Sequence, residues 1–113
     1  EPMNDKPKDT DTLFINEFRK HVQAQMSDAE LNVETLSADM GLSRVQLYRK
    51  VKALTGSSPV ELIRITRLKQ AERLLKSKGK TIAEISYEVG FSSPSYFSKC
   101  YKEYFGILPG EVK

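Results

Sequence analysis

Apolar residues recur at helical spacing along most of the chain, and no segment alternates strictly between apolar and polar positions. In residues 11–27, Phe14, Phe18, Val22 and Met26 follow one another at intervals of four, as on one face of an amphipathic helix. Further helical patterns cover residues 32–41, 43–56, 58–79, 81–90 and 93–106. The pattern therefore predicts an all-α fold of about six helices without a sheet.

Start and stop signals separate these patterns into individual helices. A serine or threonine three residues before a glutamate or glutamine forms a capping box, which satisfies free N–H groups at a helix start. The pairs of this kind are Ser43 with Gln46, Ser58 with Glu61, and Thr81 with Glu84, and Asn32 and Ser93 are further N-cap candidates. The helices are predicted to end at glycines, namely Gly41, Gly56, Gly79, Gly90 and Gly106.

The chain contains one supersecondary pattern twice. A shift of fifty residues places Ser43 on Ser93 and Gly56 on Gly106. Upstream of the turn the shift is forty-nine, because the second copy has one more residue there. Each copy reads as a short helix, a tight glycine turn and a second helix, which is the helix-turn-helix pattern. Two copies in register are much stronger evidence for this motif than one.

The patterns divide the chain into four expected parts. Residues 1–10 are predicted to be a linker or a disordered tail. We expect a first helix-turn-helix subdomain in residues 11–57, a connector helix in residues 58–78 and a second helix-turn-helix subdomain in residues 79–113. A last helix can open at Pro109, and we expect it to be frayed or truncated. Because the chain does not begin with methionine, we expect an excised piece of a longer protein.

Positive charge is concentrated in the repeated part. The 113 residues carry 18 Lys and Arg against 15 Asp and Glu, a net charge of +3. Residues 1–39 hold nine acidic residues against four basic ones, whereas residues 40–113 hold fourteen basic residues against six acidic ones. Such asymmetry is a hint of a polyanionic partner. A solvated basic face explains the charge alone equally well.

The second helix of the first copy is basic and contains no acidic residue. Leu47 and Val51 form the apolar seam that docks it, so its opposite face is free, as in helices that enter the major groove of DNA. Arginine can fork two hydrogen bonds to a guanine edge, and valine can contact a thymine methyl. The candidate DNA contacts are Ser43, Arg44, Val45, Tyr48, Arg49 and Lys52. The alternative interpretation is a solubilising basic face.

The second copy offers fewer groups that read bases. Pro94 follows its N-cap and has no donor for a base edge. Hydroxyl and backbone N–H groups near the turn can bind phosphate. We expect weaker sequence discrimination and more backbone contact from this copy, through Ser93, Ser95, Tyr96, Lys99 and Lys102.

The sequence supports neither catalysis nor metal binding. It contains no phosphate-binding loop, nucleophile motif or paired acid constellation. One cysteine, Cys100, and one histidine, His21, cannot form a zinc site, and Cys100 is read as a small core residue. We therefore expect no enzyme, metal or cofactor. Phe97 and Tyr101 are assigned to the core rather than to base stacking.

Residues from about Asn32 to Glu111 resemble the DNA-binding domain of AraC/XylS-type transcription regulators. The resemblance is carried by LYRKVKALTGSSP, by IRITRLKQAERLL in the connector and by IAEISYEVGFSSPSYFSKCYKEYFG. It implies a homeodomain-like pair of helix-turn-helix subdomains joined by a long helix, acting as a sequence-specific activator or repressor on double-stranded DNA. The chain looks most like the C-terminal output domain of hybrid two-component sensor-regulators in Bacteroidetes. Leu108 and Gly110 depart from the usual ending of the family.

The resemblance also leads to expectations about where the protein is located and which partners it binds. We expect a bacterial, cytoplasmic protein without membrane contact from this chain, and membrane attachment of the full-length protein is left open. An alternative hypothesis is that only the first copy reads DNA, while the second mainly contacts a protein, such as RNA polymerase or a twin subunit. Any homodimer is expected to form through regions outside this chain.

Overall fold

The computed structural model describes residues 9–113, and in this range it contains helices but no strand. The predicted all-α fold is therefore confirmed for the described part. The elements are α1 (Asp9–Ala24), α2 (Val33–Asp39), α3 (Arg44–Thr55), α4 (Pro59–Ser77), α5 (Ile82–Glu88), α6 (Pro94–Phe105) and the short 3-10 helix η1 (Pro109–Glu111). Of the tail predicted in residues 1–10, positions 1–8 lie outside the described residues. Positions 9 and 10 belong to α1 rather than to a tail.

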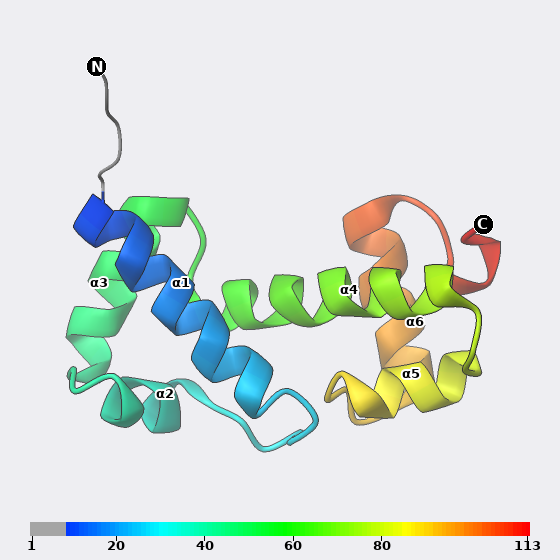
Figure 1. Ribbon diagram of the computed structural model, residues 1–113, viewed down its shortest axis with the longest axis horizontal. Coiled ribbons are helices and arrows are strands. Elements are labelled where there is room, and N and C mark those ends of the chain that lie inside the picture. The colour runs from blue at the N-terminus through cyan, green and yellow to red at the C-terminus, as the bar shows by residue number, and fades with distance from the viewer. Residues whose placement is uncertain (1–8) are drawn as a thin grey trace.

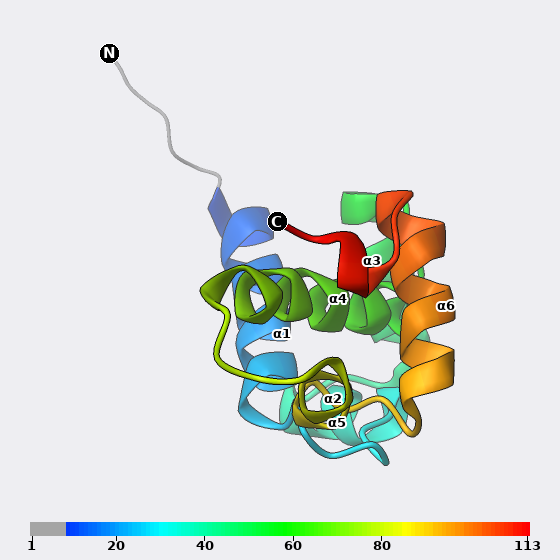
Figure 2. The same ribbon diagram turned by 90° about the vertical axis from the view of Figure 1, so that its right-hand side faces the viewer.

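The long helix α4 joins two groups of helices (Figure 1). At one end, α1 and α3 pack against it and α2 packs on these two helices, and at the other end lie α5, α6 and η1. Figure 2 shows α3 and α6 on the same side of α4, whereas α1 lies on the opposite side. This arrangement turns the second helix of each repeat toward one common face.

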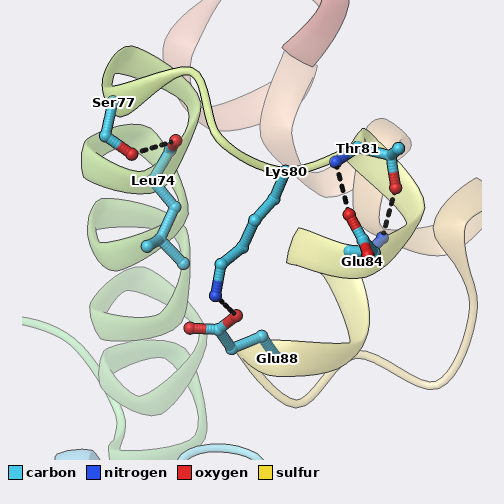
Figure 3. A network of polar contacts seen from close by, with 6 residues as sticks. All are labelled: Leu74, Ser77, Lys80, Thr81, Glu84 and Glu88. Atoms are coloured by element: carbon cyan, nitrogen blue, oxygen red, sulfur yellow. Dashed lines mark hydrogen bonds and ion pairs between the residues drawn. The ribbon is translucent and has the colours of Figure 1, made fainter.

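The predicted capping boxes are confirmed. The hydroxyl of Ser43 accepts the N–H of Gln46 at 3.1 Å, and the Ser43 N–H donates to Oε1 of Gln46 at 2.8 Å. Thr81 and Glu84 form the same pair of bonds at the start of α5 (Figure 3). At the start of α4, the backbone N–H of Ser58 lowers the pKa of the Glu61 carboxyl, because it donates to the charged form.

The predicted glycine C-caps are confirmed for α3 and α6, whereas the C-caps of α2 and α5 are Met40 and Val89, one residue before Gly41 and Gly90. Gly56 and Gly106 are left-handed C-caps with φ of 78° and 84°. The connector, however, ends at Ser77, and its left-handed C-cap is Lys78 with φ of 62°, rather than Gly79. The Ser77 hydroxyl donates to the carbonyl of Leu74 in this last turn (Figure 3). Nζ of Lys78 lies 3.4 Å from the carbonyl of Val112, so the side chain links this position to the chain end.

The two repeats have the same turn hydrogen bonds. The N–H of Leu42 donates to the carbonyl of Ser37 at 2.9 Å, and the N–H of Phe91 donates to the carbonyl of Ser86, also at 2.9 Å. Both serines are buried, and each satisfies its hydroxyl on a carbonyl of its own helix. A small residue at this position lets the second helix cross the first closely.

One continuous apolar cluster runs through both repeats and the connector. The expected docking seam of α3, formed by Leu47 and Val51, is fully buried. In α6 the rings of Phe97 and Tyr101 are buried with centroids 5.7 Å apart, and Cys100 is buried beside them. Burial raises the pKa of the Tyr101 hydroxyl, and the nearby charge of Glu72 adds to this effect. These residues belong to the core, as predicted.

The two repeats touch where Gly90 meets the end of α1. A Cβ atom on Gly90 would lie 2.0 Å from the carbonyl oxygen of Met26 and 2.8 Å from the guanidinium of Arg67. Gly90 also has φ of 93°, whereas nothing lies within 4 Å of a Cβ atom on the equivalent Gly41, which has φ of 71°. The equivalent glycines thus carry different constraints, and only Gly90 permits a close approach of the two repeats.

We expect Gly90→Ala to lower the free energy of unfolding by about 3 kcal/mol or more, because the new methyl group collides with backbone. Gly41→Ala is the matched control. It should cost about 1–2 kcal/mol, the penalty of a left-handed alanine without a collision. Urea denaturation of both variants measures the difference, and equal losses would contradict the assigned contact.

Candidate nucleic-acid interface

The exposed face of α3 is defined by helical geometry. At about 100° per residue, Val45, Tyr48, Arg49 and Lys52 fall within one third of the helix circumference, opposite the buried seam. All four are exposed, and Val45 and Tyr48 keep 58% and 49% of their accessible surface. Arg44 is also exposed and lies at the edge of this face. Apolar and cationic groups therefore share one uncovered surface, which suits contact with base edges and phosphates.

Lys50 is separated from this face by the fold. Its Nζ atom lies over the ring of Phe14 in α1, 4.9 Å from the ring centroid. This cation–π contact directs Lys50 toward α1 and away from the free face of α3. Arg49 and Lys50 are adjacent in sequence, but only Arg49 belongs to the candidate interface.

The exposed face of α6 repeats that of α3 in part. Ser95, Lys99 and Lys102 form one exposed stripe, with Lys99 and Lys102 at the positions that Arg49 and Lys52 occupy in α3. Val45 is replaced by a serine, so this stripe is more polar. This polar stripe suits phosphate contact better than apolar base contact, and the contact mode expected from the sequence stays a prediction.

Tyr96 lies at the edge of the α6 face. Its ring packs on Phe91 with centroids 5.7 Å apart, and 46% of its surface remains exposed. The predicted exposure of Tyr48 and Tyr96 is thus confirmed. Exposed Tyr87 and Tyr104, with 54% and 44% of their surface accessible, were not predicted, and no signal in the helical pattern distinguished them.

The N-terminal ends of the two exposed helices differ. Gln46 engages the backbone N–H of Ser43, whereas Tyr96 stands at the equivalent position and has no carboxamide to reach Ser93. The Ser93 hydroxyl accepts the N–H of Tyr96 at 3.1 Å. Within the described residues the backbone N–H of Ser93 has no protein acceptor, so it is available to a phosphate at the start of α6.

A cleft of about 360 Å³ lies between the two repeats, beside the first turns of α3 and α6. The connector lines it with Ile63, Arg64 and Arg67, the first repeat with Arg44, and the second with Tyr96. Sequence reasoning assigned the connector only a spacing role and missed these arginines. Their spacing of three residues, on one side of a helix, was the available signal.

Arg67 is bound into the junction of the two repeats. One of its terminal nitrogens donates to the carbonyl of Asp28 at 2.8 Å, while its Nε atom is buried without a protein acceptor. Burial lowers the pKa of this guanidinium, and the charge of Asp28 opposes the shift. The side chain is therefore held at the junction by its hydrogen bond to the carbonyl of Asp28.

The described residues contain no group of three or more His, Cys, Asp or Glu side chains that could hold a metal ion. Within the same part of the chain, every helix is too short or too polar to cross a membrane.

Two helix-turn-helix units, with cationic faces on one side of a connector, define a DNA-binding module. The chain matches the family described as "Helix-turn-helix domain" over residues 36–113. It belongs to the AraC-type helix-turn-helix family, whose members are DNA-binding transcription regulators rather than enzymes. The resemblance noted in the sequence is thereby confirmed.

Known proteins similar to this chain include a bacterial kinase and regulator domains. Histidine kinase P4 of Formosa agariphila is 39% identical over 103 residues, which are 91% of this chain and 8% of the kinase. The chain spans 8% to 36% of the lengths of the first curated relatives that it matches. The relatives are thus much longer proteins.

Similar solved structures confirm the AraC-type fold. The C-terminal domain of AraT, a response regulator from Geobacillus stearothermophilus, has a TM-score of 0.78 and 30% identity, covering 87% of this chain and 81% of that one. The DNA-binding domain of AdpA, a global transcriptional factor in complex with a target DNA, has a TM-score of 0.74 and 27% identity, covering 91% and 88%.

We expect Arg67→Ala to lower the free energy of unfolding by about 1.5–3 kcal/mol, because a charged hydrogen bond to Asp28 is lost. Arg73→Ala is the control on the same helix, since Arg73 is exposed and bonds only to Gln70 within the described residues. It should change stability by about 0.5 kcal/mol or less. Thermal or urea unfolding compares the two, and similar effects would show that Arg67 does not stabilise the junction.

Proposed function

We propose that α3 and α6 enter successive major grooves on one face of duplex DNA. The observation that carries this proposal is the placement of equivalent cations, Arg49 with Lys99 and Lys52 with Lys102, on two exposed helices that face the same side of α4 (Figure 2). A helix-turn-helix protein places its second helix in the major groove. Two such helices on one side of the molecule suit two consecutive grooves of one duplex.

The connector sets the spacing of the two helices. Its 19 residues span about 28 Å, at ~1.5 Å per residue. Successive major grooves on one side of straight DNA are about 34 Å apart. Because the connector is shorter, DNA engaged by both helices bends toward the protein.

The two units contact different parts of the DNA, base edges in the first unit and mainly phosphates in the second. In the first, Arg49 and Val45 read base edges, while Ser43, Arg44, Tyr48 and Lys52 support them. In the second, the free N–H of Ser93 and the Lys99 and Lys102 side chains bind mainly phosphate, with Ser95 and Tyr96 at the groove. Basic contacts of this kind make affinity fall steeply with salt.

The chain serves as the output domain of a longer signal-responsive regulator, of the two-component type. Support comes from its similarity to a small part of a histidine kinase and to the C-terminal domain of a response regulator. In such a protein, phosphorylation or dimerisation upstream controls when the DNA-binding units act together. Residues 11–57 and 79–113 then form the two reading subdomains, and residues 58–78 connect them.

We expect Arg49→Ala to weaken binding to the preferred DNA site by about 1–3 kcal/mol and to relax the preference at one base pair. Lys50→Ala is the matched control, because the neighbouring lysine faces Phe14. It should leave both affinity and preference nearly unchanged. Selection of bound sites from a random DNA library, followed by titration of each variant, provides the measurement.

Two results would contradict the assignment of Arg49. Equal weakening on specific and random DNA would make it a phosphate contact. A larger loss from Lys50→Ala than from Arg49→Ala would place the wrong side of α3 in the groove.

A second candidate function, contact with a protein such as RNA polymerase or a twin subunit, is favoured by one observation. Beyond the α6 stripe, Tyr104, Ile107 and Leu108 are exposed, each with more than 40% of its surface accessible. Apolar side chains grouped at the end of the second unit suit a protein partner rather than a phosphate backbone.

Lys99→Glu and the double change Tyr104→Ser with Ile107→Ser separate the two roles of the second unit. If α6 binds DNA and its end contacts a protein, Lys99→Glu should weaken DNA binding about tenfold or more, through lost attraction to phosphate. The double change should keep DNA affinity but reduce reporter transcription in cells. Unchanged DNA binding in Lys99→Glu would assign α6 to protein contact alone, and full transcription in the double variant would exclude the apolar end.

A further inference from the structure

The cleft lies between the two repeats, beside the first turns of α3 and α6. Its walls come from the start of α3, at Arg44, and from α6, at Tyr96. Its floor is α4, and α3 and α6 lie on one side of this helix in Figure 2. If α3 and α6 enter two successive major grooves of one duplex, the DNA backbone between these grooves faces the side of α4 on which both helices lie.

The floor presents one cation that the fold does not use. Arg64 is half-buried in α4, and within residues 9–113 its side chain forms neither an ion pair nor a hydrogen bond. It lines the cleft and also a neighbouring hollow with Glu103 and Tyr104. Arg67, one helical turn further along, is by contrast occupied by the carbonyl of Asp28. Arg64 is thus the arginine of the connector that remains available for a ligand.

Acidic groups lie near Arg64, but in the described part of the chain none forms an ion pair with it. The charge of Arg64 contributes to the lowered pKa of Glu61, and Glu103 lines the neighbouring hollow. Glu61 is engaged by the backbone N–H of Ser58 at 3.0 Å, and Glu34 lines the cleft on the side of the first repeat. With Arg44, Arg64 and Arg67 against Glu34, the lining of the cleft has more positive than negative charge. A phosphate diester complements this charge, and the planar guanidinium matches its two free oxygens.

We propose that Arg64 binds a phosphate of the DNA backbone between the two major grooves, so that the connector itself is part of the interface. The inference rests on the proposed binding of both exposed helices to one duplex. It adds a sequence-independent contact at the centre of the site, where a bend toward the protein brings the backbone closest to α4. Through this contact, the connector stabilises the bent complex as well as spacing the units.

Salt titration of DNA binding by the 113-residue chain tests this assignment. On a duplex with both boxes, Arg64→Ala should weaken binding about tenfold and make the slope of log affinity against log salt shallower by about one. Arg73→Ala removes the same side chain nine residues further along the same helix, about 180° around its axis. This control should leave affinity within about twofold and the slope unchanged.

Neutral methylphosphonate linkages locate the contact on the DNA. Placed between the two boxes, they should weaken the wild-type chain but have no further effect on Arg64→Ala, because both changes remove one interaction. Arg64→Lys keeps the charge and should retain most of the salt slope. Arg64→Lys therefore shows whether the weaker DNA binding of Arg64→Ala comes from the lost charge or from misfolding, because lysine disturbs the helix and its packing less than alanine does.

The outcomes distinguish the inference from the function on which it rests. If the wild-type chain shows no preference for any DNA site, the proposed function fails and the inference fails with it. If the wild type binds paired boxes but Arg64→Ala behaves like Arg73→Ala, only the inference is overturned. A second result would also overturn the inference. Benzoate, a small anionic probe, would raise the melting temperature of the wild type but not of Arg64→Ala, and Arg64→Ala would bind DNA as tightly as the wild type. Arg64 would then bind small anions but not the DNA backbone.

Discussion

The close approach of Gly90 to the carbonyl of Met26 determines how the two halves of this molecule are placed. No side chain fits at Gly90, and Arg67 fills the adjoining space while it donates to Asp28. The end of α1, the middle of α4 and the second turn are thereby joined at one point. This point fixes the relative direction of α3 and α6, and with it the geometry of any DNA that both helices touch.

On either side of that junction, the two repeats are packed by the same three features. A buried serine permits the crossing of two helices, one backbone hydrogen bond closes the turn, and an apolar seam covers the inner side of the second helix. The outer side is left uncovered because the seam needs only half of the helix. Differences between the repeats are confined to that outer side and to the caps, where Gln46 has no counterpart at Tyr96.

Sequence reasoning predicted the helices well because their signals are local. Capping boxes, a proline at the first helical position and glycine C-caps act within one turn, so they can be read without knowledge of the fold. The C-cap of α4 was assigned to Gly79, whereas Lys78 takes the left-handed conformation and its side chain reaches Val112. That contact joins residues 34 positions apart, which no local pattern contains.

The sequence by itself determined the all-α class, the repeated unit, the helix that faces outward in each copy and the family. The first three follow from periodicity and caps, which depend on neighbours along the chain. The family follows from the resemblance of its motifs to those of AraC/XylS-type regulators. Only the tertiary structure decided which basic side chains are free. Lys50 and Arg67 are held by Phe14 and Asp28, whereas Arg49 and Arg64 form no hydrogen bond or ion pair within residues 9–113. Long side chains take their partners through space, so their roles are settled only when distant segments meet.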